Sequence, residues 1–183
     1  MRNGQLRIIG GKWRGRKISF AQAPDLRPSP DRVRETLFNW LQSMIPGATC
    51  LELYAGSGIL SLEALSRGAR QVTLVEKLPS VHRQLQTTFD TIQAQNYSIS
   101  CSPAADFVHD TVESYDIVFL DPPFDSDELS LILPMLGPIM HEKSYVYVET
   151  NREISDLDGF SKYRGSRAGK VYYYLFTPLD VCR

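Results

Sequence analysis

From residue 49 onward, the sequence alternates short apolar segments with segments whose apolar residues recur every three or four positions. The short segments have the length of buried strands, and the others have the period of amphipathic helices. Strands that alternate with helices are joined by right-handed crossovers, which place them in a parallel sheet with helices on both faces. The alternation therefore predicts an α/β fold.

Five apolar segments carry the strand pattern, and four segments between them carry the helical pattern. We expect strands at residues 50–53, 72–75, 99–101, 117–120 and 145–148, and helices at residues 58–67, 81–92, 104–112 and 129–136. Gly68 follows the first of these helices, where a glycine commonly ends a helix. A last hairpin is expected over residues 160–176.

Upstream of residue 49, the pattern predicts a hairpin and then one helix. Apolar residues at 6–9 and 17–20 flank the basic, glycine-rich turn GGKWRGR, which is typical of a hairpin or an arm. An amphipathic helix is expected over residues 30–45. Ser29 is placed as its N-cap and Pro30 as its first helical residue.

The length of 183 residues is that of one domain. We expect a single compact unit made of a basic hairpin arm, residues 1–26, and a main domain, residues 27–183. No apolar run approaches the roughly 18 residues of a membrane span, and the first 17 residues do not read as a signal peptide. The three cysteines and three histidines lack zinc-like spacing, which predicts reduced thiols, no metal and a cytoplasmic location.

The net charge of −1 conceals an uneven distribution. Residues 1–34 contain nine Lys and Arg against two Asp, a net of +7, so the remainder carries −8. Residues 161–179 add four cations and no acid. This asymmetry indicates a polyanion-binding face, although solvated basic segments would give the same pattern. The candidate contacts in the arm are Arg7, Lys12, Trp13, Arg14, Arg16 and Lys17.

The segment LELYAGSG and the later VEK form a first candidate site. Gly56, Ser57 and Gly58 lie where a strand turns into a helix, so the backbone can approach a ligand and the helix offers unpaired N–H groups. Glu76 ends the next strand, a position from which an acid accepts hydrogen bonds from a ribose diol. Together these residues predict an adenosine-containing ligand, although the glycines alone would also fit a tight turn.

Two classes of adenosine cofactor compete for this site. A dinucleotide fingerprint needs a third glycine, and Ser61 stands at that position. S-adenosylmethionine instead needs an acid for its ammonium group, which Glu52 in the preceding strand can supply. A carboxylate in an apolar strand is costly unless it is paired, so Glu52 needs a cationic partner. The residues favour S-adenosylmethionine.

The segment DPPF, residues 121–124, follows a buried strand and forms a second candidate site. The strand before it is expected beside the first strand, so the segment projects over the cofactor. Asp121 and the Pro122 carbonyl can accept both N–H hydrogens of an exocyclic amine, and Phe124 can stack on its ring. This grip would aim the nitrogen lone pair at a methyl group and stabilise the charge that develops. An incidental strand-ending Asp-Pro-Pro is the alternative.

The chain resembles the bacterial RsmD-type family, the 16S rRNA (guanine(966)-N(2))-methyltransferases, through the ordered motifs RIIGGKWRGRK, RPSPDRVRETLFNWL, LELYAGSGILSLEALSRGA, VEK and YDIVFLDPPF. The resemblance covers nearly the whole chain, including the C-terminal segment GKVYYYLF. It implies the class I S-adenosylmethionine-dependent methyltransferase fold. This is a Rossmann-like, doubly wound sheet of seven mostly parallel strands, the last antiparallel, here with an N-terminal β-hairpin extension.

The resemblance also implies roles for individual residues. Cofactor contacts fall on Glu52, Gly56, Ser57, Gly58 and Glu76, and the catalytic motif on Asp121, Pro122 and Phe124. The stretch 27–36 falls on a helix near the methionine end of the cofactor, where Arg32, Arg34 and Thr36 are further candidates.

The adenine contact departs from the family pattern. Relatives usually place Asp or Asn after the third strand, whereas this chain has Pro103 there. Asp106, one helical turn later, is the candidate substitute, with a backbone group as the alternative.

The implied reaction transfers a methyl group from S-adenosylmethionine to the N2 amine of one guanine in 16S rRNA, on an assembling small ribosomal subunit, and leaves S-adenosylhomocysteine. RNA affinity would come from phosphate contacts by the arm, with Trp13 either stacking on an exposed base or anchoring the arm. We expect a monomer without a membrane partner. DNA adenine-N6 or cytosine-N4 methylation, and a non-catalytic RNA-binding assembly module, are the alternative functions.

Overall fold

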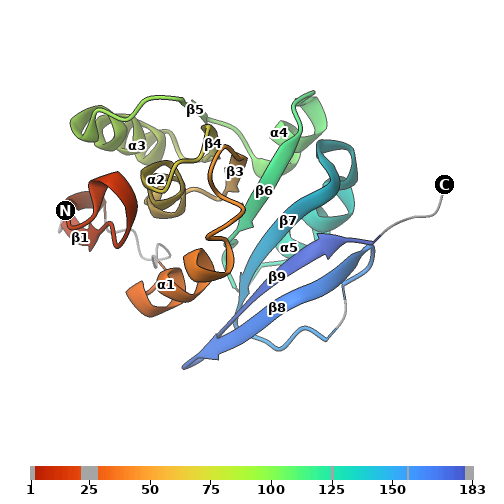
Figure 1. The fold of residues 1–183 in the computed structure, drawn as a ribbon. Coiled ribbons are helices and arrows are strands. Elements are labelled where there is room, and N and C mark those ends of the chain that lie inside the picture. The colour runs from red at the N-terminus through yellow and green to blue at the C-terminus, as the bar shows by residue number, and fades with distance from the viewer. Residues whose placement is uncertain (1–2, 22–28, 125, 156, 180–183) are drawn as a thin grey trace.

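A seven-stranded sheet forms the centre of the computed structural model, which describes residues 3–21, 29–124, 126–155 and 157–179 (Figure 1). The order across the sheet is β5-β4-β3-β6-β7-β9-β8. Strands β3 to β7 run parallel to one another, whereas β9 is antiparallel to both β7 and β8. In chain order the strands are β3 (Thr49–Leu53), β4 (Gln71–Val75), β5 (Tyr97–Ser100), β6 (Tyr115–Leu120), β7 (Met140–Thr150), β8 (Phe160–Ala168) and β9 (Val171–Pro178).

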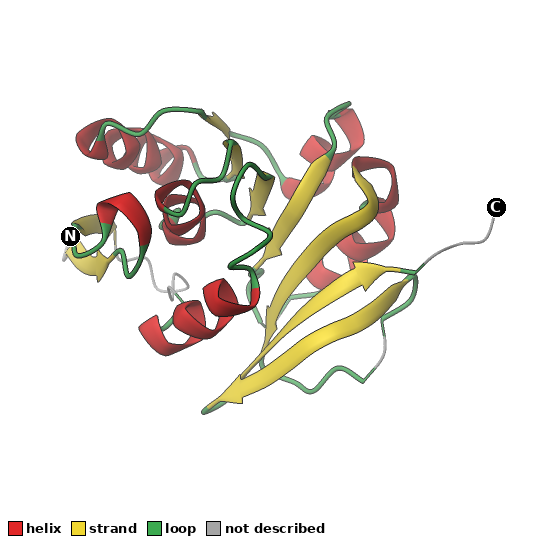
Figure 2. Ribbon diagram, viewed as in Figure 1, coloured by secondary structure: helices red, strands yellow, loops and turns green. Residues whose placement is uncertain are grey.

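Helices cover both faces of this sheet, as the alternating pattern predicts (Figure 2). Buried residues of α1, α2 and α3 share one hydrophobic cluster, and those of α4 and α5 share another. The helices are α1 (Asp31–Trp40), α2 (Ile59–Ser66), α3 (Pro79–Ile92), α4 (Ala104–Asp110) and α5 (Glu128–Ile132), with short 3-10 turns η1 (Gly11–Trp13), η2 (Leu133–Met135) and η3 (Gly137–Ile139).

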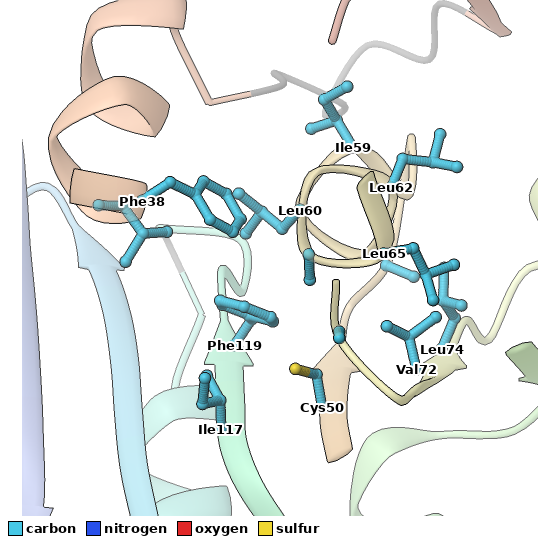
Figure 3. Packing of buried hydrophobic residues seen from close by; sticks show 14 of the residues in the cluster. Phe38, Cys50, Ile59, Leu60, Leu62, Leu65, Val72, Leu74, Ile117 and Phe119 are labelled. Carbon is cyan, nitrogen blue, oxygen red and sulfur yellow. The ribbon is translucent and has the colours of Figure 1, made fainter. Parts of the chain in front are cut away.

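Strand β6 shows how the sheet separates the two clusters. Its alternate residues point to opposite faces, so Phe119 joins the α1–α3 cluster while Val118 and Leu120 join the α4–α5 cluster. Figure 3 shows Phe119 between β3 and Phe38 of α1, whose ring centroid lies 6.2 Å away. Phe119 is fully buried, which stabilises the fold by about 1.5–3 kcal/mol. A near-continuous apolar run is what a strand covered on both faces requires.

The N-terminal hairpin, β1 (Asn3–Arg7) and β2 (Lys17–Ala21), packs on the helices of the α1–α3 face. Trp13 is buried in that cluster, and its backbone N–H donates to Ser66 Oγ at 2.9 Å. The same hydroxyl donates to the Gly10 carbonyl at 2.6 Å. Gly11 has φ of +73°, and a Cβ there would lie 1.8 Å from the Ser66 carbonyl oxygen, so this close approach requires glycine.

Ser29 is not the N-cap of α1, contrary to the sequence-based expectation. Its hydroxyl donates to Glu149 Oε1 at the end of β7, and Pro30 occupies the cap position without a side-chain bond. The prediction was wrong because a partner 120 residues away takes the hydroxyl. The segment that leads into α1 is thus tied to the sheet through Ser29.

Three expected helices end earlier than their periodicity suggested. Helix α1 ends at Trp40 and continues as turns up to Pro46. Helix α4 ends at Asp110, which leaves Val112 99% exposed rather than on a buried face. Helix α5 ends at Ile132, because Pro134 has no N–H for the next helical bond. Among the described residues, no helix has the length and apolar character that crossing a bilayer demands.

Candidate active site

The carboxyl ends of β3, β6 and β7 lie side by side on one edge of the sheet. Leu53 of β3 pairs with Leu120 of β6, which pairs with Val148 of β7. The glycine loop after β3 and Asp121 after β6 therefore emerge together, as predicted, and the last residues of β7 lie next to them. Parallel open sheets bind ligands at this edge, where neighbouring loops diverge.

The glycine loop turns sharply between β3 and α2. Gly56 and Gly58 have φ of +50° and +68°, values that favour glycine. Gly58 has a second reason to be glycine, because a Cβ there would lie 2.7 Å from Leu85 Cδ2. The loop thus combines a tight turn, close packing against α3 and a helix N-terminus that faces the site edge.

Glu76 joins this loop to the end of β4. Its Oε2 accepts the Gly56 N–H at 3.1 Å, and its Oε1 accepts the Leu78 N–H at 2.8 Å. The carboxylate is 8% exposed and is held in place by both bonds, while each oxygen retains a further lone pair. The structure brings Glu76 and the glycines together, and the ribose contact itself stays a prediction.

Glu52 points from β3 into the same site. Its Oε2 accepts the Ser61 N–H at 2.9 Å, and the residue is 4% exposed. Burial raises the pKa of this carboxyl to about 7, against the lowering effect of the bonds to Ser61. The expected cationic partner is not a protein side chain, because none of the ion pairs within the described residues includes Glu52.

Asp121 lies directly after β6, where burial and the nearby Glu149 and Glu52 carboxylates raise its pKa well above the usual value. Pro122 is buried, and Phe124 is 39% exposed. The two prolines differ in their carbonyls, because that of Pro123 already accepts the Ser126 hydroxyl at 2.6 Å. Of the two, Pro122 therefore supplies the better candidate acceptor beside Asp121.

Glu149 is a site residue that the sequence analysis missed. It ends β7 next to Asp121, is 2% exposed, and accepts hydrogen bonds from the Ser29 hydroxyl and, at 2.8 Å, from the Tyr147 hydroxyl. Burial raises its pKa, while these two donors and the charge of Arg34 act in the opposite direction. A signal was present, since an acid follows or ends the apolar run of β7 just as Glu52 and Asp121 do in theirs.

Tyr54 ties the glycine loop to the segment after DPPF. Its hydroxyl donates to Glu128 Oε2 at 2.9 Å, and Glu128 Oε1 lies 3.8 Å from Lys77 Nζ. Tyr54 itself has φ of +63°, a strained value for a tyrosine. Strain of this kind persists where surrounding contacts hold it and is common at functional sites.

Two further candidates for cofactor contacts, Arg34 and Asp106, have surroundings that differ from those expected. Arg34 is fully buried in α1, where it binds Glu63 Oε1 at 2.7 Å and the Arg7 carbonyl at 3.0 Å, so its guanidinium is committed to the fold. Asp106 is exposed in the first turn of α4, and Pro103 is the N-cap of that helix. Within the described residues, no hydrogen bond or ion pair joins Asp106 to Glu76 or the glycine loop, and its adenine role stays a prediction.

The arm presents its cations to solvent but not its tryptophan. Lys12, Arg14, Arg16 and Lys17 are exposed, and Arg7 is 62% exposed beside Asp31 at 3.9 Å. Trp13 is 7% exposed, so its ring cannot stack on a base in this conformation. The structure supports the anchoring role for Trp13, with Lys12 Nζ 4.2 Å from the ring centroid.

Comparison with known proteins agrees with this geometry. The family model described as Conserved hypothetical protein 95 matches residues 6–177. The chain belongs to this family. A member from Escherichia coli, Ribosomal RNA small subunit methyltransferase D, is 42% identical over 180 residues, covering 95% of this chain and 90% of that protein. The resemblance to the RsmD-type family is thus confirmed.

Solved structures identify the fold of this RsmD-family chain. The Escherichia coli protein yhhF superposes with a TM-score of 0.85 at 42% identity, covering 96% of this chain and 98% of that one. A protein solved in complex with SAH (S-adenosylhomocysteine) superposes with a TM-score of 0.71 at 15% identity. The match covers 88% of this chain and 53% of that one. The architecture is the class I methyltransferase fold, as expected, with an N-terminal hairpin added.

Proposed function

We propose that this RsmD-family chain transfers a methyl group from S-adenosylmethionine to the N2 amine of a guanine in 16S rRNA of the small ribosomal subunit. The observation that carries the proposal is the row of three acids beside the glycine loop: Glu52 and Glu149, which are buried, and Asp121, which is partly buried. Family membership supplies the substrate class, since the curated relative is a small-subunit rRNA methyltransferase.

The acids at this edge fit a cationic cofactor. Buried carboxylates are costly without a counter-charge, and the described ion pairs provide none for Glu52, Asp121 or Glu149. S-adenosylmethionine supplies, when bound, a methyl group activated by a positively charged sulfur. Glu52 would hold its ammonium group and Glu76 its ribose, with Gly56, Ser57 and Gly58 lining the path of the chain between them.

Asp121 and the Pro122 carbonyl would position the amine of the base. As acceptors of both N–H hydrogens, they would favour rehybridisation of the nitrogen toward sp3 and aim its lone pair at the methyl group. An amine on an aromatic ring is a weak nucleophile, so alignment accounts for much of the expected rate gain. Asp121 also stabilises the positive charge that the nitrogen gains and offers a base for the proton it must lose.

The substrate must reach this site as an unpaired or flipped nucleotide, because the amine of a paired guanine gives one hydrogen to cytosine and cannot offer both to the site. Phe124, partly exposed at the site, offers a surface on which the guanine ring can stack. The exposed cations of the arm, Arg7, Lys12, Arg14, Arg16 and Lys17, would hold phosphates nearby. We further propose that the protein acts as a cytoplasmic monomer.

The test is methyl transfer from labelled S-adenosylmethionine to three acceptors offered separately: small subunits that lack the modification, naked 16S rRNA and double-stranded DNA. We expect label in the small subunit, and N2-methylguanine after nuclease digestion and mass spectrometry. Label on adenine or cytosine of DNA would favour the amino-methyltransferase alternative. Retention of RNA without any label would favour the non-catalytic alternative.

A further inference from the structure

The β8–β9 hairpin carries a second group of cations that the proposed function does not use. Strand β8 is the last strand of the sheet and pairs only with β9. All its described residues from Ser161 to Arg167 are exposed, and residues 161–179 contain no acid. The candidate contacts are Arg164 and Arg167 in β8 and Lys170 in the turn that follows it.

The register of the sheet places the tip of this hairpin at the edge that carries the acids. Glu149 of β7 pairs with Tyr173 of β9, and Tyr173 pairs with Ser166 of β8. Arg167 is the next residue along β8, so the tip extends past the level of Glu149. In Figure 1 the tip lies near α1, on the side toward which β6 and β7 point.

The two arginines of this hairpin are held in place by neighbours that leave their charge uncompensated. Arg167 Nε donates to the Gly169 carbonyl at 2.7 Å, and its guanidinium lies 4.8 Å from the Tyr172 ring centroid. Arg164 lies 5.3 Å from the ring of Tyr163. Within the described part of the chain, no ion pair involves either arginine or Lys170. Preorganised cations of this kind suit phosphate groups.

The two hairpins stand on opposite flanks of the acids. The N-terminal hairpin packs on α2 and α3, over the β3–β5 half of the sheet, whereas β8 forms the far edge beyond β7. Three strand spacings separate β6 from β8, about 14 Å.

We propose that Arg164, Arg167 and Lys170 bind RNA backbone phosphates on the side of the target nucleotide opposite to the N-terminal arm. The inference rests on the proposed function and extends its RNA surface. The carboxylates of Glu52, Asp121 and Glu149 repel phosphates from the centre of the site. An RNA strand whose base enters that centre therefore needs cations on both flanks. The N-terminal arm alone provides cations on only one of them.

The experiment compares two double variants that lose the same charge. Arg167→Gln with Lys170→Gln removes the tip cations, and Arg70→Gln with Lys143→Gln removes exposed cations near the starts of β4 and β7, at the opposite edge of the sheet. We expect the tip variant to raise the KM for small subunits roughly tenfold, with kcat and cofactor affinity unchanged. The slope of the logarithm of the RNA binding constant against the logarithm of the salt concentration should become shallower by about 0.7 for each lost phosphate contact.

Arg167→Lys keeps the charge and should restore most of the loss, which a merely structural role for Arg167 would not predict. Equal KM values for the tip and control variants overturn the inference. Weaker binding to small subunits but unchanged binding to naked 16S rRNA also overturns it, in favour of an acidic protein partner. Failure of the proposed function gives a different result, since the unmodified enzyme would then methylate no RNA.

Discussion

Two groups of buried carboxylates lie on the same side of this sheet, and within the described residues only one of them forms ion pairs with cations. Glu63 of α2 is fully buried, with Arg34 Nη1 at 2.7 Å, Arg67 Nε at 3.4 Å and the Ile9 N–H at 2.7 Å. Glu52 is buried as deeply, and its described neighbours include no cation. The fold therefore supplies the counter-charge where an acid holds elements together. It withholds the counter-charge where a ligand is expected to bring one.

The difference teaches how to separate structural acids from functional ones. Arg34 joins α1, the end of β1 and α2 through Arg7, Asp31 and Glu63, which makes the Glu63 group a junction of the N-terminal arm with the body. The acids at the ends of β3, β6 and β7 accept hydrogen bonds from Ser61 and Ser29, but they form no comparable set of ion pairs within the described residues. Removing a cation from the Glu63 group should therefore lower the free energy of unfolding. Removing a carboxylate charge from the second group should raise it.

The largest expected effect is that of Arg34→Met. The substitution leaves the Glu63 carboxyl buried without its nearest cation and the Ser29 and Arg7 carbonyls without a donor. The loss of one partner of a buried pair typically costs about 3–5 kcal/mol of unfolding free energy. Urea denaturation of the cofactor-free protein measures it. Arg32→Met, on an exposed position of the same helix, is the control and should change stability by less than about 0.5 kcal/mol.

Asp121→Asn tests the second group directly. The amide keeps the shape and one acceptor but loses the charge that stabilises the amine nitrogen. We expect kcat to fall by about 100- to 1,000-fold, about 2.7–4 kcal/mol in activation free energy. Cofactor affinity should fall less than tenfold, and the cofactor-free protein should not lose stability. Single-turnover methyl transfer measures the rate, and a normal rate would remove Asp121 from the proposed chemistry.

Glu52→Gln sharpens the comparison through pH. The unfolded carboxyl titrates near 4.3, and the folded one near 7, so between these values the folded state binds more protons. The unfolding free energy therefore falls as pH rises from about 4.5 to 7, by up to about 3 kcal/mol. The variant lacks this cost, so we expect it to be more stable than the native protein at pH 8 and close to it in stability at about pH 4.

Cofactor binding should show the opposite dependence on pH. A cationic ligand favours the ionised Glu52, so its affinity for the native protein should rise as pH increases through about 7. Calorimetric titration at pH 6 and pH 8 measures it. An affinity of the native protein that does not change with pH, or an equal slope in Glu52→Gln, would contradict the assignment of Glu52 to the cofactor cation.

Local patterns in the sequence were sufficient to predict the fold. The apolar pattern places β3, β4 and β6 within two residues of their observed bounds, because a strand buried on both faces must be apolar throughout. Strand β7 begins five residues before its expected start, at Met140, because most of its first residues are polar and exposed. Glu76 and Asp121 were found for a related reason, since each directly follows a predicted strand whose end faces the site. Helix ends were less predictable, as Val112 shows, because tertiary contacts decide where the last turn stops.

The contacts that define the site could not be predicted in the same way. Ser29 and Glu149 are 120 residues apart, and no local pattern connects them. Arg34 was assigned to the cofactor because its neighbours resemble a family motif, yet its partner Glu63 lies on another helix. Trp13 illustrates the same limit, because its basic neighbours suggested RNA while its ring packs in the core.

Ser29→Ala carries the smallest expected effect and tests how α1 is connected to the acids. The hydroxyl donates to a carboxyl whose pKa is raised by burial, so the bond resembles a neutral one, and its loss should cost about 1 kcal/mol. Tyr147→Phe removes the other donor to the same oxygen, at 2.8 Å. With both donors gone, the pKa of Glu149 should rise further, so the double variant should lose more stability at pH 8 than at pH 5. Urea denaturation of the two single variants, the double variant and an exposed control, Ser161→Ala, measures this coupling. Strictly additive losses that do not depend on pH would show that the two hydroxyls act separately and that α1 is not connected to the catalytic edge through Glu149.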